Sequence, residues 1–599
     1  MTGPGGAQIG SAPRHMPRVA LAAKPAGAWR SRLAAATFIL AALAGAARAA
    51  DPPLAHNDPN QVVPTPPAQT PAPLPVPSAP APPPIAATPE DTAARFVLKG
   101  ASFEGASAVA ASALRPAWSP YVDKPVSLAD LRAIGHAAEA IYARAGFPFI
   151  AVLLKVQQVE DGVVHYDVVE GRISGVTALG ADPVARRQAT AMLEPLVNEV
   201  PLSLAEVETA YELARKVPGL SISGALRRSE TAGGMDLVVD AQRQSWRAYV
   251  NVNDLYADAV GPWGVLLGLD YNGPSEYGDS TSLEAYTSIP VGRQVLFHAS
   301  RSQGLDSNGL TATVSALLGT ADPKGSSVPL ELATNIQALR LEASQPLWER
   351  PNSNVVLTAA FDASNQRTQV FRNEELSDDQ LRIFSLGMAG ELTGPPGRLA
   401  ASAEVRQGVN FLGASTPGEA DLSRVGGDPQ ALVFHFGLEG ETPSRFLVQL
   451  AFRIDAQQSA DALTAPDQYS VGNLTIGRGY QPGEILGDSA LGESFEFRFG
   501  PIAIQSHLTA QPFAFVDAVR LWNNDIATFR QGVFSSVGGG VRFQIAGKFN
   551  LELTYAVPQD NLPTPGLPRP SPMVLVNLTI GLTDAFEAIH RRLSPKVSS

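Results

Sequence analysis

The sequence lacks cysteine altogether and is poor in charged and aromatic side chains. None of its 599 residues is Cys, which excludes a disulfide scaffold, a thiolate metal site and a cysteine nucleophile. Charged residues make up 17% and aromatic residues 7%, yet hydrophobic residues reach 45%, which is unlike a disordered chain. The 57 acidic residues outnumber the 45 basic ones, and this balance argues against broad electrostatic binding to nucleic acid.

Motifs that carry enzyme chemistry are missing from the sequence as well. It contains no Gly-x-Ser-x-Gly elbow and no His-Glu-x-x-His helix, and its 8 histidines are scattered. No phosphate loop or cluster of metal ligands is visible. We therefore expect neither an enzyme nor a protein that depends on a cofactor.

The first 49 residues have the features of a secretory signal peptide. Lys24, Arg30 and Arg32 precede an apolar run at residues 33–44, and small residues at positions 47 and 49 form a cleavage pattern. The alternative is an N-terminal membrane anchor, but the apolar run is short for that role. We expect residues 1–49 to be a signal peptide that is cleaved before Ala50.

Proline, alanine and threonine dominate most of residues 50–94. Such a stretch cannot pack a core, so it predicts an extended linker. The alternative is a ligand for a proline-reading domain, although no basic anchor stands beside the prolines.

Strand and helix patterns occur twice between residues 95 and 243. Ser127, Asp182 and Ser203 are expected helix caps, and Pro183 occupies the first position of the helix after Asp182. Short apolar strands flank these helices. The pattern predicts two small α+β domains, at residues 95–172 and 173–243.

From residue 244 to 582, segments of about ten residues alternate between apolar and polar side chains. Phe495, Phe497 and Phe499 face one way, whereas Glu496 and Arg498 face the other. A soluble β-sandwich hides its apolar face against a second sheet, but a membrane barrel turns that face to lipid. The length has room for about sixteen strands, so we expect an all-β transmembrane barrel, followed by a tail at residues 583–599.

The strand pattern also predicts where the barrel turns. One amphipathic strand is expected at residues 445–455. Tight turns are expected on the side of the upstream domains, and longer polar loops on the other side. The tight turns are placed near residues 290–293, 350–352 and 395–397, and the longer loops around 321–333, 367–379 and 413–428.

The longest connection, at residues 459–492, contains the sequence Gly477-Arg478-Gly479-Tyr480. Glycines on both sides of an arginine allow a narrow tip that pushes the guanidinium forward. In a later strand, Asp517 shares a face with Phe515 and offers a carboxylate if that face lines the lumen. The alternatives are an ordinary glycine-rich surface loop and an ordinary salt bridge in the lumen.

Several of these residues resemble a known family. Phe96-x-Leu98-x-Gly100 and residues 142–147 and 168–173 resemble the POTRA domains of two-partner secretion transporters, the haemolysin secretion/activation family of the outer membrane. Arg478, Gly479 and Tyr480 are similar to the tip of the loop that folds back into the barrel in this family. Phe515 and Asp517 are similar to the strand that this tip meets. Two positions depart from the family pattern, because Gly477 replaces the usual Val and Val519 replaces the usual Gly.

The resemblance implies translocation of a large secreted exoprotein across the outer membrane of a Gram-negative bacterium, with or without its activation. The unfolded exoprotein would pair with the POTRA domains in the periplasm by strand addition and then pass through the barrel. Other implied partners are outer-membrane lipids and the barrel-assembly machinery, but not nucleic acid.

The resemblance also implies that Arg478 and Asp517 hold the loop in place for secretion. We assign Glu496 and Arg498 a structural role on the lumen face. Two other functions compete with this interpretation. A barrel-assembly insertase usually carries more POTRA domains, and a passive porin needs neither upstream domains nor such a loop.

Overall fold

The computed structural model describes residues 94–583 apart from 230–233, 324–330, 372–373, 526–528 and 564–568. The expected signal peptide, nearly all of the proline-rich linker and the tail from residue 584 lie outside the described residues. Within the described ranges, no helix is both long enough and apolar enough to cross a membrane.

The first small α+β domain packs two helices against a mixed three-stranded sheet. The sheet order is β2-β5-β4, with β2 parallel to β5 and β4 antiparallel to it. The helix α3 begins at Ser127, as predicted, because the Ser127 hydroxyl accepts a hydrogen bond from the Asp130 amide and the Asp130 carboxylate accepts one from the Ser127 amide. The Ser127 amide and hydroxyl both donate to the Asp130 carboxylate, and these two hydrogen bonds lower its pKa. The elements are β1 (Ala94–Val97), β2 (Gly100–Glu104), α2 (Ala111–Trp118), η2 (Ser119–Tyr121), β3 (Pro125–Ser127), α3 (Leu128–Arg144), β4 (Ile150–Leu154) and β5 (Val163–Glu170).

The second region repeats this plan with its own buried core. Its sheet order is β6-β8-β7, α4 packs on β6 and β8, and α5 packs on β7. Asp182 caps α4 with Pro183 in the first turn, and Ser203 caps α5 through a capping box with Glu206, so both predicted caps are confirmed. The elements are β6 (Arg172–Leu179), α4 (Pro183–Leu193), η3 (Glu194–Leu196), α5 (Leu204–Arg215), β7 (Leu220–Arg228) and β8 (Gly234–Arg243).

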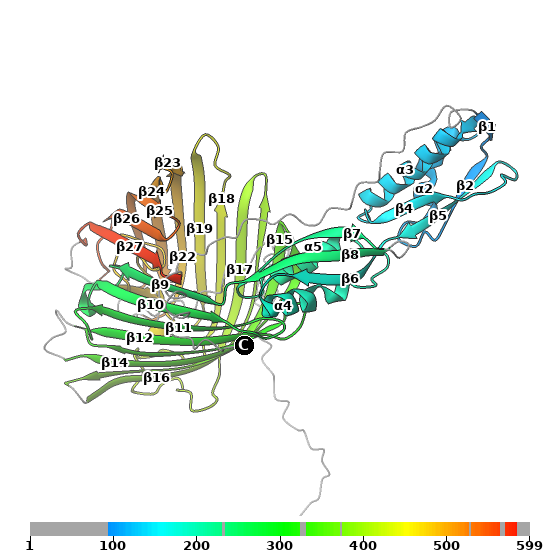
Figure 1. Cartoon of the computed structure of the whole chain (residues 1–599). Helices are drawn as coiled ribbons and strands as arrows, with labels where there is room; N and C mark the ends of the chain where they lie inside the picture. Colours follow the sequence, from blue (N-terminus) through cyan, green and yellow to red (C-terminus); the bar gives the residue numbers. More distant parts are fainter. Residues whose placement is uncertain are drawn as a thin grey trace, which may run out of the picture. The chain divides into compact units, whose positions relative to one another are not determined.

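The rest of the described chain forms a closed antiparallel barrel of sixteen strands. Its strands follow one another around the wall in chain order, and β27 pairs with β9 to close it (Figure 1). The labels number seventeen because β22 and β23 lie in line against the same neighbour, β24. Closure leaves no unpaired sheet edge for lipid to meet.

The bounds of the strands are as follows. The first half comprises β9 (Trp246–Asn253), β10 (Trp263–Asn272), β11 (Asp279–Ile289), β12 (Gln294–Gly304), β13 (Thr311–Ala321), β14 (Ala333–Arg350), β15 (Ser353–Val370) and β16 (Glu374–Gly394). The second half comprises β17 (Gly397–Gly408), β18 (Leu432–Glu441), β19 (Val448–Ser459), β22 (Ser489–Phe499), β23 (Ile502–Gln505), β24 (Leu508–Trp522), β25 (Gln531–Ile545), β26 (Phe549–Pro558) and β27 (Met573–Gly581). A short 3-10 helix, η4 (Asp258–Val260), lies between β9 and β10.

Side chains alternate between the two faces of the wall as the sequence predicted. Phe495 is 55% exposed on the outside, whereas its neighbour Glu496 is 8% exposed on the lumen side. Phe497 and Phe499 follow Phe495 on the outer face. The apolar residues therefore form an outer belt suited to lipid, and the charged residues face inward.

Three predictions about strand ends were wrong. The turn at residues 290–293 lies at the end of the barrel away from the upstream domains, because it follows the third strand of the up-and-down series. The Arg293 carbonyl accepts a hydrogen bond from the Asp322 amide in the next connection at that end. The predicted loop at 367–379 belongs mostly to β15 and β16. Most of its side chains are polar, but the backbone of residues 367–370 pairs with that of residues 374–378 across the ladder.

The third correction concerns the predicted strand at 445–455, which starts only at Val448. Phe446 and Leu447 adopt positive φ angles in the hairpin turn between β18 and β19. Hairpin-turn residues with positive φ are usually Gly, Asn or Asp. Because Phe446 and Leu447 are apolar instead, the sequence pattern extended the strand into the turn.

Candidate functional site: the loop inside the barrel

The connection between β19 and β22, residues 460–488, carries its own small core. We call it the luminal loop. It contains η6 (Ala465–Asp467), and its two short strands, β20 (Tyr469–Val471) and β21 (Ile485–Gly487), pair as a hairpin. Apolar side chains from the loop and from the lumen face of the barrel wall form one buried cluster: Tyr469, Val471, Ile476, Tyr480, Ile485, Ala490, Val519, Leu521 and Phe534. Apolar packing thus seats the loop on β24 and β25.

Two glycines let the tip of the luminal loop approach the wall closely. Gly477 has a φ of +116°, which side-chain-bearing residues rarely adopt. A Cβ atom on Gly479 would lie 2.8 Å from both the Ser536 Cβ and the Pro558 nitrogen. Glycine is therefore required at position 479 for space and at position 477 for backbone conformation.

Between these glycines, Arg478 binds Asp517 on β24 through a bidentate ion pair. Its Nε lies 3.0 Å from Asp517 Oδ2 and its Nη2 lies 2.8 Å from Oδ1. The Arg478 amide and the Ser494 hydroxyl also donate to this carboxylate, at 3.0 and 2.7 Å. Asp517 is only 1% exposed, and these four hydrogen bonds compensate the loss of water around its charge.

The ring of Phe515 packs against the Arg478 guanidinium. The Arg478 guanidinium carbon lies 3.5 Å from the centre of the Phe515 ring, a close cation–π contact. The ring has room because a Cβ atom on the facing residue, Gly538, would lie 2.7 Å from it. Phe513 and Gly540 repeat this arrangement two residues along the ladder. The alternation of phenylalanine and glycine on paired strands thus makes room for two rings, with Phe515 packed against Arg478 and Phe513 against Arg542.

Glu496 is the centre of a wider charge network that the sequence analysis missed. It accepts hydrogen bonds from Arg478 at 2.9 Å, from Arg498 at 2.6 Å and from Arg542 at 2.6 and 3.1 Å. Arg542 also lies over the Phe513 ring. Three arginines thus converge on one carboxylate that the sequence analysis treated as an ordinary lumen residue. The signal was weak, because only strand register brings Arg542 next to Glu496.

Tyr480, the last residue of the tip, is fully buried. Its hydroxyl donates to the Ser535 carbonyl at 3.1 Å and accepts from the Asp560 amide at 3.1 Å. Its ring meets Phe534 edge-on. The tyrosine therefore ties the tip to the start of β25 and to the connection after β26.

Val519 does not prevent the loop from docking. Its side chain is completely buried in the loop's core. Its partner on β22 is Gly492, where a Cβ atom would lie 2.9 Å from the Tyr469 hydroxyl. A glycine on the neighbouring strand therefore leaves the space for this part of the loop.

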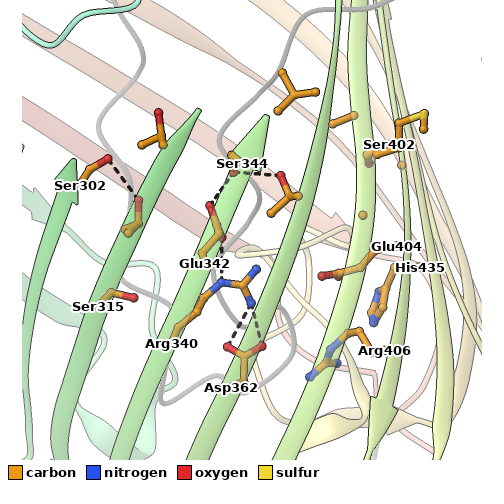
Figure 2. A pocket seen from close by; sticks show the side chains of 18 of the residues that line it. Ser302, Ser315, Arg340, Glu342, Ser344, Asp362, Ser402, Glu404, Arg406 and His435 are labelled. Carbon is orange, nitrogen blue, oxygen red and sulfur yellow. Dashed lines mark hydrogen bonds and ion pairs between the residues drawn. The ribbon is translucent and has the colours of Figure 1, made fainter. Parts of the chain in front are cut away.

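A cavity of about 960 Å³ adjoins the luminal loop and is lined mainly by β12–β19. Figure 2 shows Arg340 between Glu342 and Asp362, with Glu404, Arg406 and His435 on the neighbouring strands. Arg340 binds Asp362 at 2.8 and 3.0 Å and Glu342 at 3.0 Å. Small side chains such as Ser315 and Ser402 alternate with these charges.

Comparison with known proteins places the chain in a family. Residues 96–171 match the model of the POTRA domain, ShlB-type. Residues 233–543, more than half of the chain, match the model of the haemolysin secretion/activation protein ShlB/FhaC/HecB. The chain belongs to this family. It is an outer-membrane transporter of a two-partner secretion system, with a secreted exoprotein as its partner and with its POTRA domains in the periplasm.

Individual relatives of this transporter are distant in sequence. The heme/hemopexin transporter protein HuxB of Haemophilus influenzae (strain 86-028NP) is 21% identical over 473 residues, which cover 74% of this chain and 79% of HuxB. The solved structure of CdiB from Escherichia coli has a TM-score of 0.69 at 17% identity and covers 94% of this chain and all of CdiB. CdiB from Acinetobacter baumannii has a TM-score of 0.58 at 16% identity and covers 92% of this chain and 98% of that protein. These structures share the fold of the transporter.

Proposed function

We propose that the transporter captures its unfolded exoprotein on the POTRA domains and conducts it through the barrel while Arg478 fixes the tip of the luminal loop. The proposed role of Arg478 rests on one observation: the buried Asp517 accepts four hydrogen bonds, and three of them come from Arg478. An ion pair at this depth need not stabilise the fold, because desolvation offsets much of the attraction. Its value is positional, since a bidentate fork allows one orientation of the loop tip.

The capture step is supported by the sheet order of the two POTRA regions. In the first sheet β2 and β4 are at the edges, and in the second β6 and β7 are. An extended polypeptide can add to such an edge through main-chain hydrogen bonds without a defined sequence. This property suits a partner that arrives unfolded.

The remaining partners and the domain division belong to the same proposal. The outer belt of apolar side chains suits outer-membrane lipids, and a barrel of this kind is expected to need the barrel-assembly machinery for insertion. We divide the chain into a signal peptide (1–49), a linker (50–94), two POTRA domains (95–172 and 173–243), the barrel (244–582) and a tail (583–599).

The role of the tip is tested by replacing each partner of the ion pair. Arg478→Ala and Asp517→Ala are each expected to reduce export of the cognate exoprotein strongly, because either change releases the tip. Export is measured as exoprotein in the medium relative to transporter in the outer membrane. A suitable control is Arg398→Ala, since Arg398 binds the buried Glu391 at 2.7 Å within the wall and lies outside the tip network. Undiminished export in both tip variants, at normal barrel levels, would refute the proposal.

A further inference from the structure

A second arginine, far along the chain from the tip, binds the two ends of the luminal loop. We call these ends, residues 460–468 and 485–488, the stem of the loop. Arg424 belongs to residues 409–431, the connection between β17 and β18, which we call the covering loop. It makes a two-pronged ion pair with Asp488, in which Nη2 lies 3.1 Å from Oδ2. Its Nε lies 2.8 Å from Asp525 Oδ2, and its Nη1 donates to the Leu463 carbonyl at 2.9 Å. This arginine therefore reaches two other connections of the barrel.

Asp488, the last residue of the luminal loop, is 0% exposed. Besides Arg424, it accepts from the Leu463 amide at 3.0 Å, the Gln468 side chain at 3.2 Å and the Asn524 amide at 2.7 Å. Leu463 and Gln468 lie in the first part of the luminal loop, whereas Asp488 ends it, and Asn524 belongs to the connection between β24 and β25. One buried carboxylate thus joins three connections with the help of a single arginine.

The covering loop has further contacts with the stem. The Ala465 amide donates to the Ser423 hydroxyl at 2.9 Å, and the Asp428 amide donates to the Ala462 carbonyl at 2.7 Å. Leu463 is buried against Ala431 and Val433. The contact is therefore a continuous seam, with polar and apolar parts, and Arg424 and Asp488 are its charged centre.

Strand parity places this seam at the outer end of the barrel. The covering loop, the luminal loop and the connection after β24 follow the ninth, eleventh and thirteenth strands, and β9 starts at the end next to the POTRA domains. All three connections therefore leave the wall on the cell-exterior side. The tip of the luminal loop is held by a different set of residues, so the same loop is fixed independently at two places.

We propose that Arg424 and Asp488 form an outer latch, a pair of positioning residues that hold the stem of the luminal loop under the covering loop and restrict the outer mouth until the exoprotein passes. The proposal deepens the proposed function and rests on it, because it assigns the luminal loop a second point of control. Without Arg424, the carboxylates of Asp488 and Asp525 would face each other in a buried site with no arginine between them, which favours separation of the loops.

Conductance in planar lipid bilayers tests the latch in the full-length transporter. Arg424→Ala is expected to raise the resting conductance several-fold, and Arg424→Lys to raise it less, because lysine keeps the charge but loses the fork. The matched control is Arg367→Ala, since Arg367 pairs with Glu375 and Asp378 near the same end of the barrel, and neither of these partners belongs to the luminal loop. An unchanged conductance in Arg424→Ala, with a normally folded barrel, would overturn the latch.

A cross-link tests the same seam without removing a charge. The chain contains no cysteine, so Ser423→Cys together with Ala465→Cys introduces the only thiol pair, at a place where the two residues already form a hydrogen bond. Oxidation is expected to block export, and reduction to restore it. Normal export by the oxidised protein would overturn the latch even if Arg424→Ala failed to fold. If the cross-link blocks export but Arg478→Ala exports normally, the proposed role of the tip fails and the latch stands.

Discussion

Two charge clusters on opposite sides of the barrel lumen, one around Glu496 and one around Arg340, carry similar residue types but use them differently. On the side of β22–β25, Glu496 and Asp517 bind an arginine that comes from the luminal loop. Across the lumen, Arg340 of β14 binds carboxylates of its own wall, at Glu342 and Asp362, although Arg406 of β17 also reaches the luminal loop and binds Asp467. A charged side chain that pairs within the wall has its hydrogen bonds satisfied there and holds no loop. A charged side chain that pairs with a loop residue fixes the position of that loop. The role of a charged residue in the lumen therefore depends on whether its partner belongs to the wall or to a loop.

The largest effect should come from adding one methyl group at the tip. Gly479→Ala is expected to abolish most export, because its Cβ would lie 2.8 Å from atoms of Ser536 and Pro558 and the tip could not seat. Gly387→Ala on the other side is the control, since its Cβ would lie 3.6 Å from its nearest neighbours. Export and outer-membrane levels are measured for both. Equal export by the two variants would remove the distinction between the two sides.

A smaller effect is expected from removing one carboxylate on each side. Glu496→Ala leaves three arginines without their shared partner and should lower the free energy of unfolding by about 3–5 kcal/mol. Glu342→Ala should cost less, because Arg340 keeps its bidentate bond to Asp362. The measurement is the denaturation midpoint in detergent. Unfolding is monitored by gel electrophoresis, in which the folded barrel migrates faster than the unfolded chain. A larger loss in Glu342→Ala would contradict the comparison.

The smallest effect is expected from Tyr480→Phe. The change removes one hydroxyl with two backbone partners but keeps the ring in its pocket, so the expected loss is about 1 kcal/mol in the free energy of unfolding. Export should stay close to that of the unchanged protein, because the Arg478 pair remains. A complete loss of export in this variant would show that Tyr480, rather than Arg478, fixes the tip.

Much of the fold could be predicted from local pattern. The helix caps at Ser127, Asp182 and Ser203 were predicted because a capping residue acts on amides within a few positions of itself. The outward Phe495 and inward Glu496 were predicted because a strand alternates faces at every residue. Local pattern did not predict at which end of the barrel residues 290–293 turn, because the end depends on counting every preceding strand correctly.

The candidate site was only partly predictable. The residues of the tip and its strand were found through a family resemblance, and the structure brings Arg478 and Asp517 together. Arg542 and Ser494 were missed because their contacts depend on the register of β22, β24 and β25. Gly538 and Gly540 lie on the same face of β25 as Arg542, but the reason for glycine at these positions is visible only beside the phenylalanine rings.

The amino-acid order alone indicated that apolar and polar side chains alternate in segments of about ten residues beyond residue 244 and that the chain crosses a membrane as paired strands, because both follow from a period of two residues. Tertiary structure decided which charges meet. Arg478 lies 39 positions from Asp517, and Arg424 lies 64 from Asp488. Such distances are bridged only when the wall closes and fixes the strand register, since a shift of one residue in β24 would turn Asp517 from the lumen toward lipid.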